Sequence, residues 1–147
     1  MIQLFTELQE KKNVRSNLSA LRASLKEATE EQKAQAIEFV RGHEDLVFGF
    51  LQEEDAKTRK NAALLLGDLA VQNALQPLWK AYTREQTLFV KSAYLEAMKA
   101  LHAEEILSQL KDRLAELEGE PVTEENRKHR EAELRALRAI LIQYEGI

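Results

Sequence analysis

The chain has 147 residues and a formal net charge of −4, and apolar residues make up 44% of it. This composition is typical of a single globular domain and is too apolar for a disordered segment. The chain has no cysteine, which excludes disulfides, cysteine-ligated metal sites and thiol catalysis and favours a cytoplasmic location. The N-terminus does not resemble a signal peptide, and no apolar run approaches the ~18 residues of a membrane span.

Strong helix formers dominate the sequence, and apolar residues recur at helical spacing along its whole length. β-branched residues are scattered, which argues against strands. Short connections between the helical segments favour antiparallel neighbours. The predicted helices cover residues 2–12, 14–25, 30–42, 43–53, 55–70, 74–84, 87–101, 104–117 and 123–144.

Several polar residues stand where a predicted helix begins and are expected to cap it. Thr29 is followed three residues later by Gln32, which is the spacing of a capping box. Asn73 is followed by Gln76 at the same spacing. The expected N-cap residues are Asn13, Thr29, Asp55, Asn73, Thr87 and Thr123.

The stretch 55–70 is the most apolar predicted helix, and it contains an internal repeat. Residues 58–69 align without gaps on residues 90–101, so that Arg59 meets Lys91 and most apolar positions coincide. A shift of 44 residues in the other direction places residues 58–69 on residues 14–25. A period in this range predicts stacked two-helix units, each of which cannot bury its apolar face alone.

The repeated stretch resembles the first helix of a HEAT repeat, which reads roughly V-R-x-x-A-A-x-A-L-G-x-L. Residues 74–81, A-L-Q-P-L-W-K-A, resemble the second helix. Thr58 departs from the pattern, as does Lys99, which stands where the first copy has Gly67. The residues that carry the resemblance are Arg59, Asn61, Ala62, Ala63, Leu66, Gly67 and Leu69.

The resemblance implies an all-α fold, a right-handed α-solenoid of stacked antiparallel helix pairs with about nine helices. The expected single domain covers residues 1–147. Its repeat-like units are 13–53, 55–84 and 87–118, and its C-terminal capping helix is 123–145. An ordinary helical bundle is the alternative. In a stack, the small residues Ala62, Ala63 and Gly67 would let neighbouring helices approach closely.

No constellation of residues indicates catalysis. His43, His102 and His129 are far apart in the chain and lack metal-ligand spacing. Adjacent carboxylates cluster where helices begin, where the helix dipole favours negative charge. There is no nucleophile elbow and no glycine-rich phosphate loop. We therefore expect a protein that is not an enzyme and that needs no cofactor or metal.

In stacked repeats the second helices line the inner, concave surface, which is where we expect a binding site. Trp79, the only tryptophan, either packs at the edge of the core or contacts a ligand, since aromatic side chains anchor partners and stack on bases. The candidate binding residues are Gln76, Trp79, Lys80, Gln109 and Arg113.

Three functions are compatible with this sequence. The first is a non-enzymatic scaffold that binds a protein partner on its concave face. The second is binding of nucleic acid, including a role as the N-terminal recognition domain of a larger, methyltransferase-like RNA-modifying enzyme, because the end of the chain at Gly146 resembles a helix stop that leads into further modules. The third is a helical-repeat lyase or DNA-repair enzyme. The sequence predicts that the protein does not associate with a membrane, and it does not indicate the oligomeric state.

Overall fold

The computed structural model describes residues 1–145, and within them it contains nine α-helices, two short 3₁₀ helices and no strand. The predicted all-α class is therefore confirmed for this part of the chain. The α-helices are α1 (Ile2–Gln9), α2 (Val14–Leu25), α3 (Glu30–Gly42), α4 (Glu44–Phe50), α5 (Ala56–Asp68), α6 (Leu75–Arg84), α7 (Leu88–Ala100), α8 (Leu107–Gly119) and α9 (Arg127–Glu145), and the 3₁₀ helices are Gln72–Ala74 and Glu104–Ile106.

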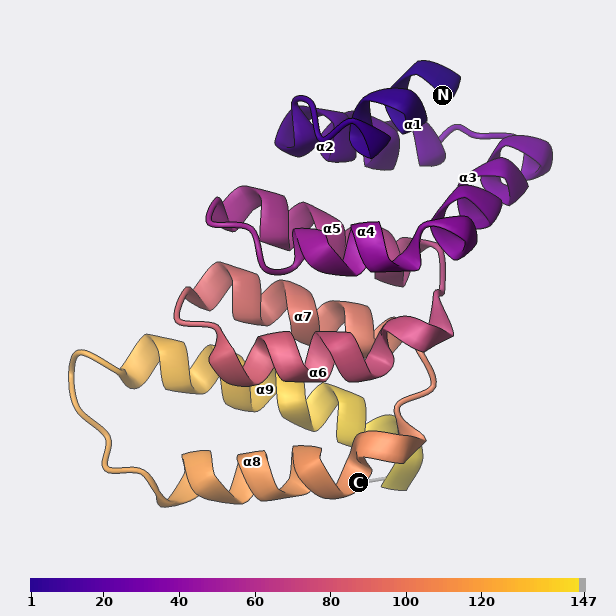
Figure 1. The fold of residues 1–147 in the computed structure, drawn as a ribbon. Helices are drawn as coiled ribbons and strands as arrows, with labels where there is room; N and C mark the ends of the chain where they lie inside the picture. Colours follow the sequence, from indigo (N-terminus) through magenta and orange to yellow (C-terminus); the bar gives the residue numbers. More distant parts are fainter. Residues whose placement is uncertain (146–147) are drawn as a thin grey trace.

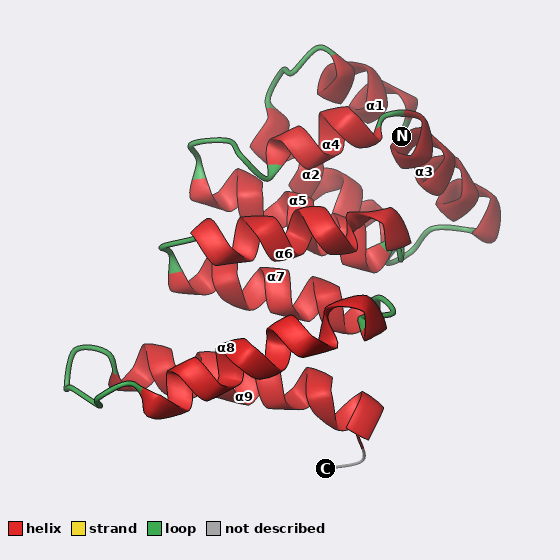
Figure 2. Ribbon diagram, turned by 60° about the horizontal axis from the view of Figure 1, so that its bottom comes forward, coloured by secondary structure: helices red, strands yellow, loops and turns green. Residues whose placement is uncertain are grey.

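The helices pack in two layers. Helices α2, α5, α7 and α9 follow one another in the first layer, each in contact with the next (Figure 1). Helices α4, α6 and α8 lie against α5, α7 and α9 and form the second layer, which faces the viewer in Figure 2. Helix α1 packs on α2, and α3 leads from α2 to α4. The core lies between the two layers and between successive helices of the first layer.

Helix α5 is covered on several sides, as its apolar sequence predicts. It contacts α2 and α7 within its own layer and α4 in the other. Ala62, Ala63 and Leu66 are fully buried. Gly67 lies so close to α7 that a side chain there would meet the backbone of Ala97. Small residues thus set the spacing between α5 and α7, and leucines fill the remaining space.

Two of the predicted caps form as expected. The Thr29 hydroxyl accepts a hydrogen bond from the Gln32 N–H at 3.1 Å, and the Gln32 side chain accepts one from the Thr29 N–H at 3.0 Å. This is a complete capping box at the start of α3. At the start of α5, the Asp55 carboxylate accepts hydrogen bonds from both the N–H and the hydroxyl of Thr58.

The prediction that Asn13 caps its helix through its side chain is wrong. Asn13 does precede α2, but its backbone is left-handed, with φ of 45°, and its side chain makes no capping bond. Asparagine tolerates this conformation better than most residues. The Asn17 amide instead donates to the Lys12 carbonyl at 2.9 Å and closes the turn between α1 and α2.

The capping box predicted at Asn73 and Gln76 is also wrong. Asn73 lies inside a 3₁₀ helix, and Ala74 occupies the position before α6, where no side chain caps the helix. The Asn73 amide donates to the Glu44 carboxylate of α4 at 3.3 Å. The local pattern predicted that the Asn73 side chain would cap the helix, but this side chain bonds to a residue distant in the chain instead. Thr87 precedes α7 as expected but makes no side-chain capping bond.

The C-terminal helix begins slightly later than predicted. The Thr123 hydroxyl accepts a hydrogen bond from the Asn126 N–H at 3.2 Å, and α9 starts at Arg127. The helix stop predicted at Gly146 lies outside the described residues. Among the helices described in residues 1–145, none combines the length and the apolar character needed to cross a bilayer.

Candidate functional site

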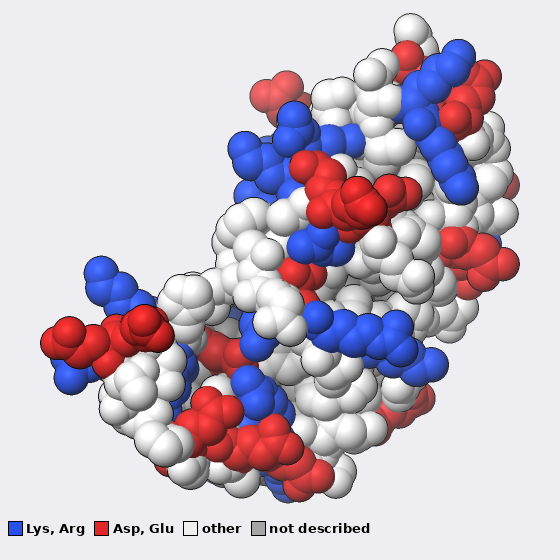
Figure 3. Space-filling view, turned by 60° about the vertical axis from the view of Figure 1, so that its left-hand side comes forward, with Lys and Arg blue, Asp and Glu red and all other residues white. Residues whose placement is uncertain are grey.

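A series of ion pairs runs along one edge of the stack, and we call it the edge ladder. Each pair joins a basic residue near the start of a first-layer helix to a carboxylate that lies on the next first-layer helix or in the loop before it. Figure 3, which brings this edge forward, shows basic and acidic side chains interleaved along it. The pairs are Arg15–Asp55 at 3.4 Å, Arg59–Glu85 at 2.8 Å and Lys91–Glu133 at 3.1 Å.

The three basic members of the edge ladder occupy equivalent positions of the internal repeat. The shift of 32 residues superposes Arg59 on Lys91, and the shift of 44 residues superposes it on Arg15. Each stands in the first turn or just after it, at the end of the helix nearest the connecting loops. The recurrence of a basic residue in the sequence therefore marks an electrostatic contact from one first-layer helix to the next such helix or to the loop before it.

The central pair of the edge ladder, Arg59 and Glu85, is held by several hydrogen bonds. Arg59 binds both carboxylate oxygens of Glu85, at 2.8 and 2.9 Å, and also donates to the carbonyls of Glu53 and Glu54. The Tyr94 hydroxyl donates to Glu85 at 3.2 Å. Burial raises the pKa of Glu85, but the bonds from Arg59 and its other donors outweigh burial and hold the pKa below its ordinary value.

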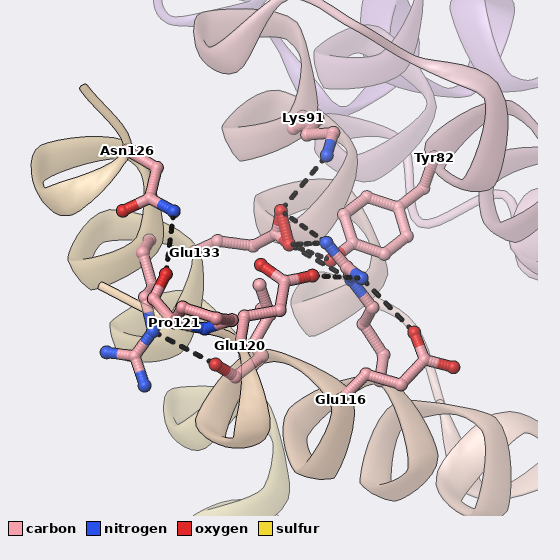
Figure 4. A network of polar contacts seen from close by, with 10 residues as sticks. Tyr82, Lys91, Glu116, Glu120, Pro121, Asn126 and Glu133 are labelled. Atoms are coloured by element: carbon pink, nitrogen blue, oxygen red, sulfur yellow. Dashed lines mark hydrogen bonds and ion pairs between the residues drawn. The ribbon is translucent and has the colours of Figure 1, made fainter. Parts of the chain in front are cut away.

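The last pair is part of a larger network around Glu133, which is only 4% exposed. Figure 4 shows Lys91 of α7 and Tyr82 of α6 pointing toward this carboxylate. Arg113 of α8 also binds it. The Tyr82 hydroxyl donates at 2.9 Å, and Arg113 donates from two nitrogens, the shorter distance being 2.9 Å. Burial raises the pKa of Glu133, but Lys91, Tyr82 and Arg113 together lower it below its ordinary value.

The network leaves Glu133 unsuited to act as a general acid or base. Its two oxygens already accept hydrogen bonds from three side chains, and its lowered pKa keeps it ionised at neutral pH. Burial and the charge of Glu133 raise the pKa of Tyr82, which therefore stays protonated. The arrangement joins α7, α8 and α9 through satisfied charges, which is a structural contact rather than a reactive centre.

Two grooves flank α6 on the surface of the second layer. The α4–α6 groove has a volume of about 650 Å³. Apolar side chains and charges of both signs line it. The residues that characterise it are Phe48, Pro77, Ala81, Glu53, Glu54, Lys80 and Arg84.

The α6–α8 groove is smaller, with a volume of about 360 Å³. Its α6 wall is aromatic, with the rings of Trp79 and Tyr82 5.4 Å apart and tilted by 39°. Its α8 wall is polar and carries the side chains of Gln109, Asp112, Arg113 and Glu116. Glu85 and Gln86 line both this groove and the α4–α6 groove.

The structure separates the five predicted binding residues into three places. Trp79, Gln109 and Arg113 line the α6–α8 groove together. Lys80 lines the α4–α6 groove on the other side of α6. Gln76 is exposed on α6 and lines neither groove. Four of the five candidate residues are therefore divided between two grooves that lie on either side of α6.

Sequence reasoning missed two carboxylates of the α6–α8 groove, Asp112 and Glu116. Both follow Gln109 at helical spacing, at i+3 and i+7, so the selection of Gln109 could have led to them. None of the three histidines lines the α6–α8 groove, and His129 lines a separate pocket that also contains Glu133. Within the described residues, no group of three or more histidine or acidic side chains is arranged to hold a metal ion.

Comparison of the chain with protein-family models, with curated proteins and with solved structures gave no match. We therefore infer a function from the two grooves and the edge ladder.

Proposed function

We propose that this chain is a non-enzymatic, HEAT-like scaffold that binds a protein partner on the face formed by α4, α6 and α8. The observation that carries the proposal is the pair of grooves on either side of α6. They present apolar side chains, the partly buried ring of Trp79 and charges of both signs. Such a mixture of anchors and polar groups is typical of protein interfaces.

The ion pairs that the basic residues make within the chain favour a protein partner over a nucleic-acid partner. Binding of phosphates requires cations that are free to replace counterions. Arg59, Lys91 and Arg113 are instead held by carboxylates of the same chain. In the α4–α6 groove, Lys80 and Arg84 share the walls with Glu53 and Glu54, so the groove has no strong positive field.

The HEAT-like part of the proposal is supported by the agreement between repeat and packing. Helices α2, α5 and α7 carry the aligned copies, and they are neighbours in the first layer. The equivalent basic residues of the copies each pair with a carboxylate on the next first-layer helix or in the loop before it. A right-handed α-solenoid with the second helices on its concave side would produce this pattern. In such a solenoid, α6 and α8 would lie on the surface that contacts the partner.

A site-specific cross-linking experiment tests the proposed function. The photoreactive residue benzoylphenylalanine replaces Gln76, which is exposed on α6 of the second layer, or Glu96, which is exposed on α7 of the first layer. We expect irradiation in cells to give a protein adduct from position 76 and little or none from position 96. A nuclease-sensitive adduct at position 76 would support the RNA-recognition alternative and reject the protein partner. Equal adducts from both positions would reject the α4–α6–α8 face.

A further inference from the structure

The α6–α8 groove has an excess of negative charge. Lys91 and Arg113 are the cations at this place. The carboxylates of the groove lining are Glu85, Asp112 and Glu116, so three carboxylates stand against two cations. Glu85 is paired with Arg59, and Arg113 is paired with Glu116 and with Glu133, which Lys91 also contacts. Asp112 makes no ion pair among the described residues, so the chain's own cations leave this carboxylate of the groove unpaired.

The opposite wall of the same groove offers an aromatic surface. Trp79 is only partly buried, so its indole ring is accessible from the groove. The groove already contains one contact between a cation and an aromatic ring, since the Lys91 ammonium lies 5.8 Å from the centre of the Tyr82 ring. Tryptophan is the aromatic residue that attracts cations most strongly, at up to about 6 Å from the ring centre.

We infer that the α6–α8 groove receives an arginine or lysine side chain of the protein partner, between the Trp79 ring and the Asp112 carboxylate. The inference rests on the proposed function and specifies the chemistry of the partner at this site. Arginine fits better than lysine, because its planar guanidinium stacks on an aromatic face while its N–H groups donate to a carboxylate and to the Gln109 amide oxygen. A volume of about 360 Å³ accommodates one such side chain.

Trp79 makes the inference directly measurable, because it is the only tryptophan of the chain. The probe is a blocked peptide, acetyl-Gly-Arg-Gly-Arg-Gly-amide, and the matched control peptide carries citrulline, which is neutral but has nearly the same shape as arginine. We expect the arginine peptide to change the Trp79 fluorescence in a saturable way that weakens as salt is added. The citrulline peptide should bind at least several-fold more weakly.

Substitution of Asp112 provides the second readout. Asp112 is exposed, so Asp112→Asn should leave the fold intact, which far-ultraviolet circular dichroism verifies. We expect this variant to bind the arginine peptide about five-fold more weakly, as for loss of one solvent-exposed ion pair. The matched control is Asp45→Asn, at an exposed position of α4 that lines neither groove. It should bind like the unaltered protein.

The outcomes separate this inference from the proposed function. Equal binding of the arginine and citrulline peptides, no response of Trp79, or unchanged affinity of Asp112→Asn would each overturn the basic-residue site. If position 76 still gives a protein adduct in Asp112→Asn, the scaffold function remains supported even when the basic-residue site is rejected. A nuclease-sensitive adduct would reject the scaffold function, whatever the peptide does.

Discussion

Gly67 of α5 packs directly on the backbone of Ala97 of α7. A Cβ atom placed on Gly67 would lie 2.9 Å from the Ala97 Cα and 3.2 Å from its Cβ, and the nearer atom belongs to the main chain, so it cannot move aside as a flexible side chain can. The contact sets the distance between the two central helices of the first layer. It also explains why the most apolar stretch of the sequence contains a glycine.

We therefore expect Gly67→Ala to lower the free energy of unfolding by about 1–3 kcal/mol, as overpacked core positions do. This loss occurs although alanine is the better helix former by about 1 kcal/mol. Urea denaturation followed by circular dichroism measures the change. The control is Gly49→Ala in α4, where a Cβ would have no neighbour within 4 Å. It should raise stability slightly, and a Gly67→Ala variant as stable as Gly49→Ala would refute the close contact.

The edge ladder predicts that two arginines at equivalent repeat positions differ in importance. Arg59→Lys removes a bidentate contact with Glu85 and the bonds to two carbonyls, because an ammonium group cannot reproduce the planar fork. We expect a loss of about 1–3 kcal/mol in unfolding free energy. Arg15→Lys should change it by less than about 0.5 kcal/mol, since the side chains of Arg15 and Asp55 are 56% and 47% exposed. Equal losses in chemical denaturation would contradict this distinction.

The lowered pKa of Glu133 predicts a loss of stability in acid. A carboxylate whose pKa is lower in the folded state than in the unfolded chain stabilises the fold above its unfolded pKa, near 4.5, and this contribution is lost as the pH falls through the folded value. Glu133→Gln keeps the shape but removes the charge, so it should be less stable than the unaltered protein at pH 7. The stability difference between the two proteins should shrink below about pH 4. Denaturation curves at several pH values test this, and a pH-independent difference would count against it.

The raised pKa values of Tyr82 and Tyr94 predict resistance to alkali. Burial is the main cause for both, followed by the nearby carboxylates Glu133 and Glu85. A tyrosine whose pKa is higher when folded stabilises the fold below its unfolded pKa, near 10, and loses this contribution as the pH rises above it. The folded protein should therefore gain less phenolate absorbance at about pH 10.5 than the urea-unfolded chain. Replacing Tyr82 with Phe should leave the folded signal unchanged, and a smaller signal would show that Tyr82 ionises.

Local features of the fold could be predicted from the sequence because they depend on neighbours in the chain. The helices follow from apolar spacing, and Thr29 and Asp55 cap because their hydrogen-bond partners lie three residues away. The apolar character of α5 correctly indicated burial on several sides. Asn73 failed as a cap because Glu44, 29 residues earlier, provides a competing partner that no local pattern reveals.

The acidic side of the edge ladder could not be predicted, because partners come from different parts of the chain. The repeat identified the basic positions, but Glu85 lies in a loop and Glu133 in a helix, 26 and 42 residues after their partners. For the same reason the sequence placed Lys80 and Trp79 on one surface. Their neighbouring positions on α6 face different helices, and only the packing shows which groove each one lines.

The position of Glu85 between the two grooves has a consequence for binding. Its carboxylate is a wall of both the α4–α6 and the α6–α8 groove, and it also holds Arg59 in place. A molecule that enters one groove and shifts Glu85 therefore alters the other groove. Occupation of the two sites is then linked thermodynamically, and the linkage is reciprocal: each ligand changes the affinity for the other by the same factor.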